Sequence, residues 1–328
     1  AQAAENNKDV TVLMELRARF DDESNINWSE RLEEAGCQVI YGFEGFKVHS
    51  KICLITRRDK GNIQYITQVG TGNYNEKTAK LYTDLCLMTA NQEIGTDAAV
   101  FFKNMAIANL DGSYNRLLVA PHSLKNALLD CIDEEIAKAK AGQPAKMILK
   151  MNSITERKLI DKLAEASQAG VQIQMIVRGI CCIVPHVPGK TDNIDIISIV
   201  GRFLEHPRIY VFGAGEDPKI YIGSADMMTR NTDRRVEIAC PVLDPNIKKR
   251  VLKIVDIMLR DNVKARVLQS DGRYLKKELA PGEPLVNSQE YFIATAREMA
   301  KKQPAPEPVK KKNHALGRFF RMLADKFE

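Results

Sequence analysis

The sequence predicts an α/β fold of two similar halves, each a β-sheet flanked by helices. Apolar strand segments alternate with amphipathic helix segments, first over residues 10–42 and again over 146–179. The halves also share short polar blocks in the same order, which indicates an internal duplication. The length of 328 residues, with 45% hydrophobic and 27% charged residues, suits roughly two globular domains.

The two repeats each predict a strand, a helix and a second strand. In the first half, VTVLMELRA precedes a helix with apolar spacing at Trp28 and Leu32, and CQVIYG follows. In the second half, KMILKMN precedes a helix predicted to open with a capping box from Ser153 to Glu156, and VQIQMIVRG follows.

Longer helices are predicted over residues 120–142 and about 246–261. After these the composition changes to KKQPAPEPVKKKN, a solvated Pro/Lys linker that precedes a short basic amphipathic helix. The predicted organisation is a first catalytic domain, truncated in its amino-terminal part, a second catalytic domain and a tail, over residues 1–113, 114–297 and 298–328.

Composition excludes several classes of protein. No apolar run approaches the roughly 18 residues that span a bilayer, and the first residues lack the basic and apolar regions of a signal peptide. The 7 cysteines form no C-x-x-C pair, so we expect neither zinc nor disulfides and infer a reducing cytoplasm. The net charge of +6 would suit nucleic acid, another polyanion or neither.

The polar blocks of the two halves align in a single register. KVHSKICLI matches EHPRIYVF, and VGTGNYNEKTAKLYTD matches IGSADMMTRNTDRRVE. The second match needs no gap and aligns Gly70 with Gly223, Thr71 with Ser224, Asn73 with Asp226, Lys77 with Arg230, and Asp84 with Glu237.

Two of the 5 histidines occupy the same place in the repeats. His49 and His206 each stand two residues before a cation, Lys51 or Arg208, in segments predicted as strands. Residues i and i+2 of a strand point to the same face. Each half therefore offers one imidazole beside one fixed positive charge, and packing the halves face to face would place both imidazoles in one site.

The glycine–hydroxyl pairs of the second block predict tight turns at strand ends. Backbone N–H groups exposed by such a turn can bind phosphoryl oxygens. The carboxylates that follow, Asp84 and Glu237, are placed to accept a proton from an imidazole and so fix its tautomer. Taken alone, each of these residues can be explained by a purely structural role. Their repetition in both halves favours a functional site.

The motifs resemble those of the phospholipase D superfamily, whose duplicated H-x-K and G-[ST]-x-N blocks build one two-histidine phosphoryl site. The later Asp of the hydrolases is replaced here by Thr56 and Gly213, and the second lysine is Arg208. GTGNYNEKTAKLYTD, MIVRGICC, SADMMTRN and the region around ELRARFDDESNINW resemble the carboxy-terminal half of bacterial polyphosphate kinase, the long histidine-phosphorylated type. This resemblance covers about residues 9–270.

The resemblance implies two phospholipase D-like domains, each a mixed sheet flanked by helices, related by a pseudo-twofold axis with the active site between them. It implies that His49 is the phosphorylated nucleophile and that His206 is the second histidine, which assists proton transfer and contacts the nucleotide. It also places Tyr82 and Arg178 on ATP, and Arg19 at the magnesium–triphosphate end. Family members carry further amino-terminal domains that we do not expect in this chain.

Elementary chemistry adds roles for the charged residues. Phosphoryl transfer needs positioning and charge neutralisation, which Mg²⁺, Lys51 and Arg208 would supply, while Asp84 and Glu237 orient the histidines. An acceptor polyphosphate is a dense polyanion, and arginine binds phosphate through two parallel hydrogen bonds. We therefore expect a polyphosphate channel lined by the cations after the glycine turns, namely Lys77, Lys80, Arg230, Arg234 and Arg235.

The leading hypothesis is a cytoplasmic enzyme that transfers the ATP γ-phosphate reversibly to inorganic polyphosphate through phosphohistidine. One alternative is a phospholipase D-like phosphodiesterase or nuclease, and another is a non-catalytic polyphosphate-binding fragment. The expected partners are ATP, ADP, polyphosphate and further copies of the chain, with no nucleic acid. Membrane association is not indicated. His122 and His186 are interpreted as structural or surface residues.

Overall fold

The computed structural model describes residues 1–15 and 22–302. The chain divides into two compact units, Ala1–Gln289 and Glu290–Glu328. The first unit contains both halves of the repeat, and helix α9 (Ser288–Lys302) begins at its end. Within the described ranges, no helix is both long enough and apolar enough to cross a membrane.

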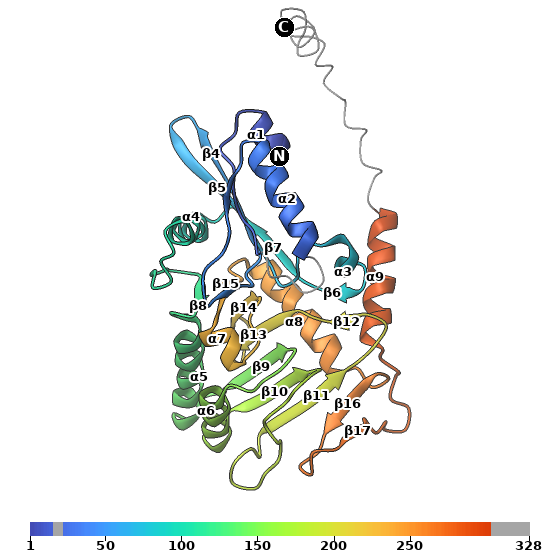
Figure 1. The fold of residues 1–328 in the computed structure, drawn as a ribbon. Helices are drawn as coiled ribbons and strands as arrows, with labels where there is room; N and C mark the ends of the chain where they lie inside the picture. The colour runs from blue at the N-terminus through green and yellow to red at the C-terminus, as the bar shows by residue number, and fades with distance from the viewer. Residues whose placement is uncertain (16–21, 303–328) are drawn as a thin grey trace, which may run out of the picture. The chain divides into compact units, whose positions relative to one another are not determined.

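A ten-stranded mixed sheet organises the second half (Figure 1). Its strands are β3 (Lys47–Val48), β8 (Leu118–Ala120), β9 (Lys146–Met151), β10 (Gln172–Val177), β11 (Ile194–Ile199), β13 (Arg208–Phe212), β14 (Lys219–Gly223), β15 (Arg235–Pro241), β16 (Ala265–Leu268) and β17 (Tyr274–Lys276). The order is β17-β16-β11-β10-β9-β13-β14-β15-β3, and β8 pairs with β15. The apolar runs of β9 and β13 are buried along almost their whole length, as expected for central strands.

Helices cover both faces of this sheet. Helices α5 (Leu124–Lys140) and α6 (Arg157–Gln168) bury their apolar residues against β9 and β10 in one core, while α8 (Pro245–Leu259) packs on the other face against β13 and β14. The predicted capping box is wrong, because α6 begins at Arg157 and the hydroxyl of Ser153 accepts a hydrogen bond from the N–H of Ile180 instead. Ser153 thus makes a tertiary hydrogen bond in place of the predicted capping hydrogen bond.

The first half repeats this plan in smaller pieces. The predicted strand–helix–strand pattern forms β1 (Thr11–Leu13), α2 (Asp22–Glu34) and β2 (Gln38–Ile40), with β1 and β2 parallel. An antiparallel sheet of β4, β5 and β7 carries α4 on one face (Figure 1). The remaining bounds are α1 (Gln2–Glu5), β4 (Ile52–Asp59), β5 (Asn62–Gly70), α3 (Glu76–Ala79), β6 (Tyr82–Thr83), β7 (Cys86–Thr89), α4 (Gln92–Ala106), β12 (Leu204–Glu205) and α7 (Thr229–Asp233).

The two halves differ where the first parallel strand meets the first antiparallel one. In the second half β9 is hydrogen-bonded to β13, whereas the corresponding strands of the first half, β1 and β4, are not paired in the part of the chain that the structure describes. A cavity of about 670 Å³ lies between them, lined by both strands and by Phe101 and Phe102 of α4. The two halves therefore share the order of their strands and helices but not all of their strand pairing.

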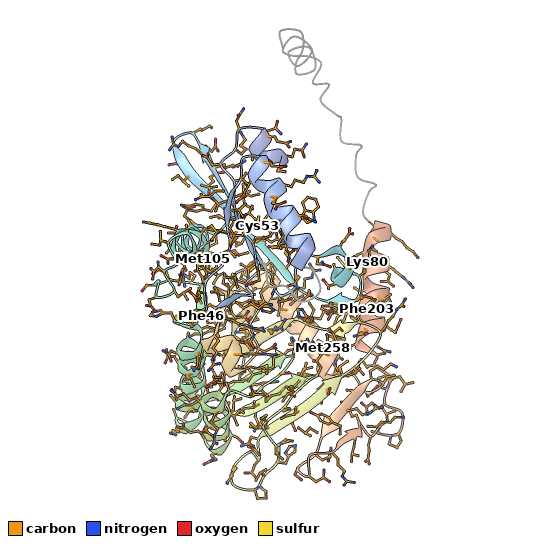
Figure 2. The ribbon with its side chains drawn as sticks, in the orientation of Figure 1. Phe46, Cys53, Lys80, Met105, Phe203 and Met258 are labelled. Atoms are coloured by element: carbon orange, nitrogen blue, oxygen red, sulfur yellow. The ribbon has the colours of Figure 1, made fainter. Side chains whose placement is uncertain are left out.

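Backbone pairing ties the halves together at two places. Strand β3 of the first half runs parallel to β15 of the second, and β6 runs parallel to β12. One core contains Val69 and Ile94 of the first half together with Val236 and Ile238 of the second. Figure 2 shows Met105, on α4, and Phe46, ahead of β3, within the packed side chains of this unit. The ends of β3 and β12, where the histidines stand, are consequently fixed by both halves.

The core of the second half should determine the stability of the fold. Leu149 on β9 is fully buried, so Leu149→Ala should lower the free energy of unfolding by about 2–5 kcal/mol, which urea denaturation followed by circular dichroism would measure. Leu285→Ala is the matched control because Leu285 is 71% exposed, and it should change that energy little. Equal effects of the two variants would contradict this description of the core.

Candidate active site

The two histidines lie between strands and not within one, which corrects the sequence prediction. His49 follows β3 and precedes β4, and the N–H groups of His49 and Ser50 both donate to the carbonyl of Val236 on β15, at 2.9 and 3.0 Å. His206 stands between β12 and β13. Short strands on either side of each histidine therefore hold it, because the chain must leave one sheet and enter another at this point.

Each imidazole is hydrogen-bonded to a carboxylate of the other half. The Nδ1 atom of His49 lies 2.9 Å from Oε2 of Glu237, and the Nδ1 atom of His206 lies 2.8 Å from Oδ1 of Asp84. A carboxylate can only accept, so Nδ1 carries the proton and Nε2 keeps a lone pair when the ring is neutral. Nε2 of His49 is thus a potential nucleophile, whereas Nε2 of His206 lies 3.1 Å from Nη1 of Arg208, which can donate to it.

The glycine–hydroxyl turns do not expose a phosphate cradle as predicted. Thr71 and Ser224 are buried, and their N–H groups bond the carbonyls of Leu85 and Ile238. The hydroxyl of Thr71 donates to Asp84 at 2.6 Å.

The hydroxyl of Ser224 donates in the same way to Glu237, which also accepts from the side-chain amide of Asn231 at 2.6 Å. These two hydroxyls, at the same place in each repeat, therefore orient the carboxylates, which in turn orient the imidazoles.

Burial favours the neutral form of both imidazoles, and the groups around Glu237 favour its ionised form. Burial lowers the pKa of His49, against the attraction of Glu237, and burial likewise lowers the pKa of His206. Burial alone would raise the pKa of Glu237, but the imidazole of His49, the charge of Lys51 and the hydrogen bond from Ser224 together lower it. A neutral imidazole beside an ionised carboxylate is the arrangement that nucleophilic attack requires.

The two cations of the repeat have different surroundings. Arg208 is buried and salt-bridged to Asp226 at 2.9 Å. The residue of the first half that corresponds to Asp226 is the uncharged Asn73. Lys51 is buried and donates to the carbonyl of His49, and burial lowers the pKa of its ammonium to about 7. A phosphoryl group bound beside Lys51 would add negative charge and so favour the protonated ammonium.

The residues matched to nucleotide contacts lie on the His206 side. The ring of Tyr82 lies 5.1 Å from the His206 ring, centroid to centroid, at an interplanar angle of 48°. The Nε atom of Arg178 donates to the carbonyl of Glu205 at 2.6 Å. Arg19 lies outside the described residues.

One of the cations predicted to line a polyphosphate channel, Arg235, lies beside the crossed pairs. Arg235 is half-buried and interacts electrostatically with Glu237, Arg230 and Arg208. Lys77, Lys80 and Arg234 are exposed, and Figure 2 shows Lys80 at the end of α3. Among the described residues, no group of three or more His, Cys, Asp or Glu side chains could hold a metal ion.

Sequence reasoning missed two residues that shape the site. Asn231 reaches Glu237 from α7, and nothing in the local sequence signals that contact. Gly72 lies so close to Asp84 that a Cβ atom there would stand 2.1 Å from Oδ2. The second glycine of GTGN is a visible signal, because a glycine beside polar residues often marks a close approach.

Two imidazole–carboxylate pairs are joined across the two α/β halves, with two buried cations beside them. This arrangement provides the nucleophile and the positive charge that phosphoryl transfer requires. The family model described as Polyphosphate kinase C-terminal domain 2 matches residues 117–289, and the model Polyphosphate kinase C-terminal domain 1 matches residues 1–110. The chain belongs to the polyphosphate kinase family.

Individual relatives support this assignment. Polyphosphate kinase of Staphylococcus haemolyticus is 47% identical over 96% of this chain and 44% of its own length. The crystal structure of polyphosphate kinase from Porphyromonas gingivalis matches 92% of this chain and 46% of its own, with 38% identity and a TM-score of 0.83. The chain thus spans less than half the length of these relatives.

A phosphatidylserine synthase of Haemophilus influenzae shares the fold alone, with 13% identity and a TM-score of 0.56 over 92% of this chain and 83% of its own. The predicted α/β fold of two similar halves is confirmed.

Removing the space beside Asp84 should disturb His206 specifically. Gly72→Ala should push the carboxylate away and weaken its hydrogen bond, so that Nδ1 protonation of His206 is no longer dominant in ¹⁵N NMR of histidine-labelled protein. In Gly70→Ala the new Cβ would have its nearest neighbour at 3.4 Å, an ordinary contact, and His206 should keep its wild-type tautomer. An unchanged His206 signal in Gly72→Ala would refute this account of the glycine.

Proposed function

We propose that this chain carries the catalytic centre of a polyphosphate kinase, which transfers the γ-phosphate of ATP reversibly to inorganic polyphosphate through phosphohistidine at His49. The observation that carries the proposal is the pairing of His49 with the buried carboxylate of Glu237 at 2.9 Å. This pair leaves Nε2 free to attack while Nδ1 holds its proton. Family membership supports the choice of substrates.

The first half-reaction forms a nitrogen–phosphorus bond. The lone pair of His49 Nε2 attacks the γ-phosphorus in line, the bond to the β–γ bridging oxygen breaks, and ADP leaves with that electron pair. The ring then carries one positive charge, with Nδ1–H still bonded to Glu237, so the ionised carboxylate stabilises the intermediate. Lys51 and Arg208 neutralise the phosphoryl oxygens during the transfer.

The second half-reaction passes the phosphoryl group to polyphosphate. A terminal oxygen of the acceptor attacks the phosphorus, and the bond to His49 Nε2 breaks, which regenerates the neutral imidazole. His206, held by Asp84, assists proton transfer at the leaving or attacking phosphate, and the same steps in reverse make ATP from ADP. Arg235, with the exposed Arg230, Lys77, Lys80 and Arg234, would guide the polyanion by bidentate and ionic contacts.

The nucleotide would lie on the His206 side, with Tyr82 and Arg178 against it. Magnesium is proposed as part of the substrate, coordinated by triphosphate oxygens and water, because Mg²⁺ usually binds proteins through few carboxylates and several phosphate oxygens. Arg19 would then stand at the magnesium–triphosphate end. We also propose that the enzyme works in the cytoplasm, where ATP is abundant. We further propose that it forms a homo-oligomer.

Labelling with γ-³²P-ATP and Mg²⁺ tests the intermediate directly. We expect acid-labile, alkali-stable label on the protein, lost in His49→Ala and retained in His122→Ala, because His122 is half exposed beside Asp111 and outside the site. Transfer of that label to added polyphosphate would establish the acceptor.

Three other outcomes of this experiment would redirect the assignment. Label that water removes, together with cleavage of a diester substrate, would favour the phosphodiesterase alternative. Absence of label in the folded chain, followed by label in a polypeptide of the relatives' full length, would assign this chain a polyphosphate-binding role that needs the rest of the protein. Label retained in His49→Ala would contradict the proposed nucleophile.

The pH dependence of labelling should report the environment of His49. Burial lowers the pKa of His49 from the usual value near 6.5, so the neutral imidazole persists to lower pH and the acid limb of labelling should lie below that of a free imidazole. Lys51 contributes to the lowered pKa of His49, so Lys51→Met should raise that pKa and move the acid limb to higher pH, while lowering the maximal rate. The profile is measured as kcat/KM for ATP, corrected for titration of ATP itself. A limb that moves to lower pH in Lys51→Met would contradict this electrostatic description.

A further inference from the structure

A buried lysine beside His206 has no role in the proposed chemistry. Lys150 lies on β9 with only 1% of its surface exposed. Its Nζ atom donates to the carbonyl of Pro207 at 3.0 Å and lies 3.4 Å from Oε2 of Glu205. Lys150 therefore contacts the residues on both sides of His206 without touching the imidazole itself.

The carboxylate of Glu205 collects hydrogen bonds from three elements. Besides Lys150, it accepts from the hydroxyl of Thr83 at 3.0 Å and from the side-chain amide of Gln289 at 2.8 Å. Gln289 also accepts from the N–H and donates to the carbonyl of Phe203, each at 2.9 Å. Residues of both halves thus converge on one carboxylate that is itself 5% exposed.

This cluster lies one step from the His206–Asp84 pair. Strands β6 and β12 are parallel, with Thr83 opposite Glu205, so the next residue along each chain is Asp84 or His206. The contact between Thr83 and Glu205 and the contact between Asp84 and His206 are consecutive links across the same seam. Any slip between the two strands would change both.

The first histidine is placed by a different means. The residue before His49 is the apolar Val48, and backbone hydrogen bonds to Val236 fix the chain there. A buried ion pair at the corresponding place before His206 is costly, since removing two charges from water offsets most of their attraction. Burial indeed lowers the pKa of Lys150 to about 8 despite the neighbouring Glu205. Stability alone would be served as well by apolar residues, so the pair calls for another explanation.

We propose that Lys150 and Glu205 are positioning residues that fix the main chain around His206 and the register of the seam that carries Asp84, and so align the second histidine for phosphoryl transfer. The inference rests on the proposed function for its kinetic consequence. Its structural consequence, the alignment of His206 with Asp84, does not depend on that function.

The test removes both members of the ion pair together, so that neither charge stays buried without its partner. Lys150→Met combined with Glu205→Leu removes both buried charges at similar volume, a change that buried ion pairs often tolerate in stability. Glu205→Gln is the milder variant, which keeps hydrogen-bonding capacity and removes the charge. The matched control is Glu135→Gln, because Glu135 is also buried, accepts from Lys138 at 2.5 Å, and bonds the N–H of Lys146 at the start of β9.

Three readouts on the whole chain separate positioning from folding. Thermal unfolding should show a folded double variant. In ¹⁵N NMR of histidine-labelled protein, with His206 assigned from a His206→Gln spectrum, the double variant should lose the dominant Nδ1-protonated form and Glu205→Gln should show a smaller change. With ATP and polyphosphate, kcat should fall about 10- to 100-fold with KM for polyphosphate within about threefold, as expected for a misplaced group that still binds substrate. Glu135→Gln should match the wild type in all three.

Several results would overturn the inference. A folded double variant with the wild-type His206 tautomer and wild-type kcat would show that the pair is only structural. If the double variant does not fold, Glu205→Gln decides, and a wild-type tautomer in that variant refutes positioning. An equal loss in Glu135→Gln would attribute the effect to general loosening of the fold. If the wild-type chain itself transfers no phosphate, the proposed function fails while the NMR comparison still tests the alignment.

Discussion

Each of the two paired imidazoles, those of His49 and His206, is hydrogen-bonded to a carboxylate that the other half of the molecule provides. Glu237 is completely buried, so it is tolerable as an anion only when His49, Ser224 and Asn231 are all in place around it. Asp84 is likewise held by Thr71 and by His206. Each carboxylate has partners in its own half, but an imidazole of the other half completes its set of hydrogen bonds. The crossed pairs therefore form only when the two halves are packed correctly. The parallel pairing of β3 with β15 and of β6 with β12 aligns the backbone so that the crossed contacts can form.

A pattern repeated within one chain can identify the right residue and still predict the wrong contact for it. The hydroxyl after each glycine is an example. The pattern predicts Thr71 and Ser224 beside phosphate, but both are buried under the carboxylates they orient. The repetition indicates correctly that a short hydroxyl is required after the glycine. It does not indicate what the hydroxyl contacts, because the partners, Asp84 and Glu237, lie 13 residues further along the chain and are brought back by the fold.

Sequence reasoning succeeds where information is local or repeated, and fails where the contact is distant. The alternation of strands and helices predicts β9, α6 and β10, and the gapless register aligns Asp84 with Glu237 from the residues alone. It does not indicate which imidazole each acid meets, because the crossing arises from packing. The prediction of a strand at His49 is wrong for a related reason, since β3 leaves its own half to pair with β15 and the chain must turn before β4. Lys150 carries no signal at all within its apolar run.

The two halves differ in the groups that surround their imidazoles. A perfectly symmetric site would present two equivalent imidazoles, yet Arg208 is salt-bridged to Asp226 while the first half has the uncharged Asn73 at the place of that aspartate. In the proposed reaction Arg208 would therefore meet the phosphoryl group from a position fixed by Asp226, and Lys51 would meet it without such an aspartate. On the His206 side, Glu205 and Lys150 also fix the main chain. Duplication supplied two similar imidazoles, and under the proposed mechanism the differences between the residues around them would allow one to take the phosphate and the other to assist.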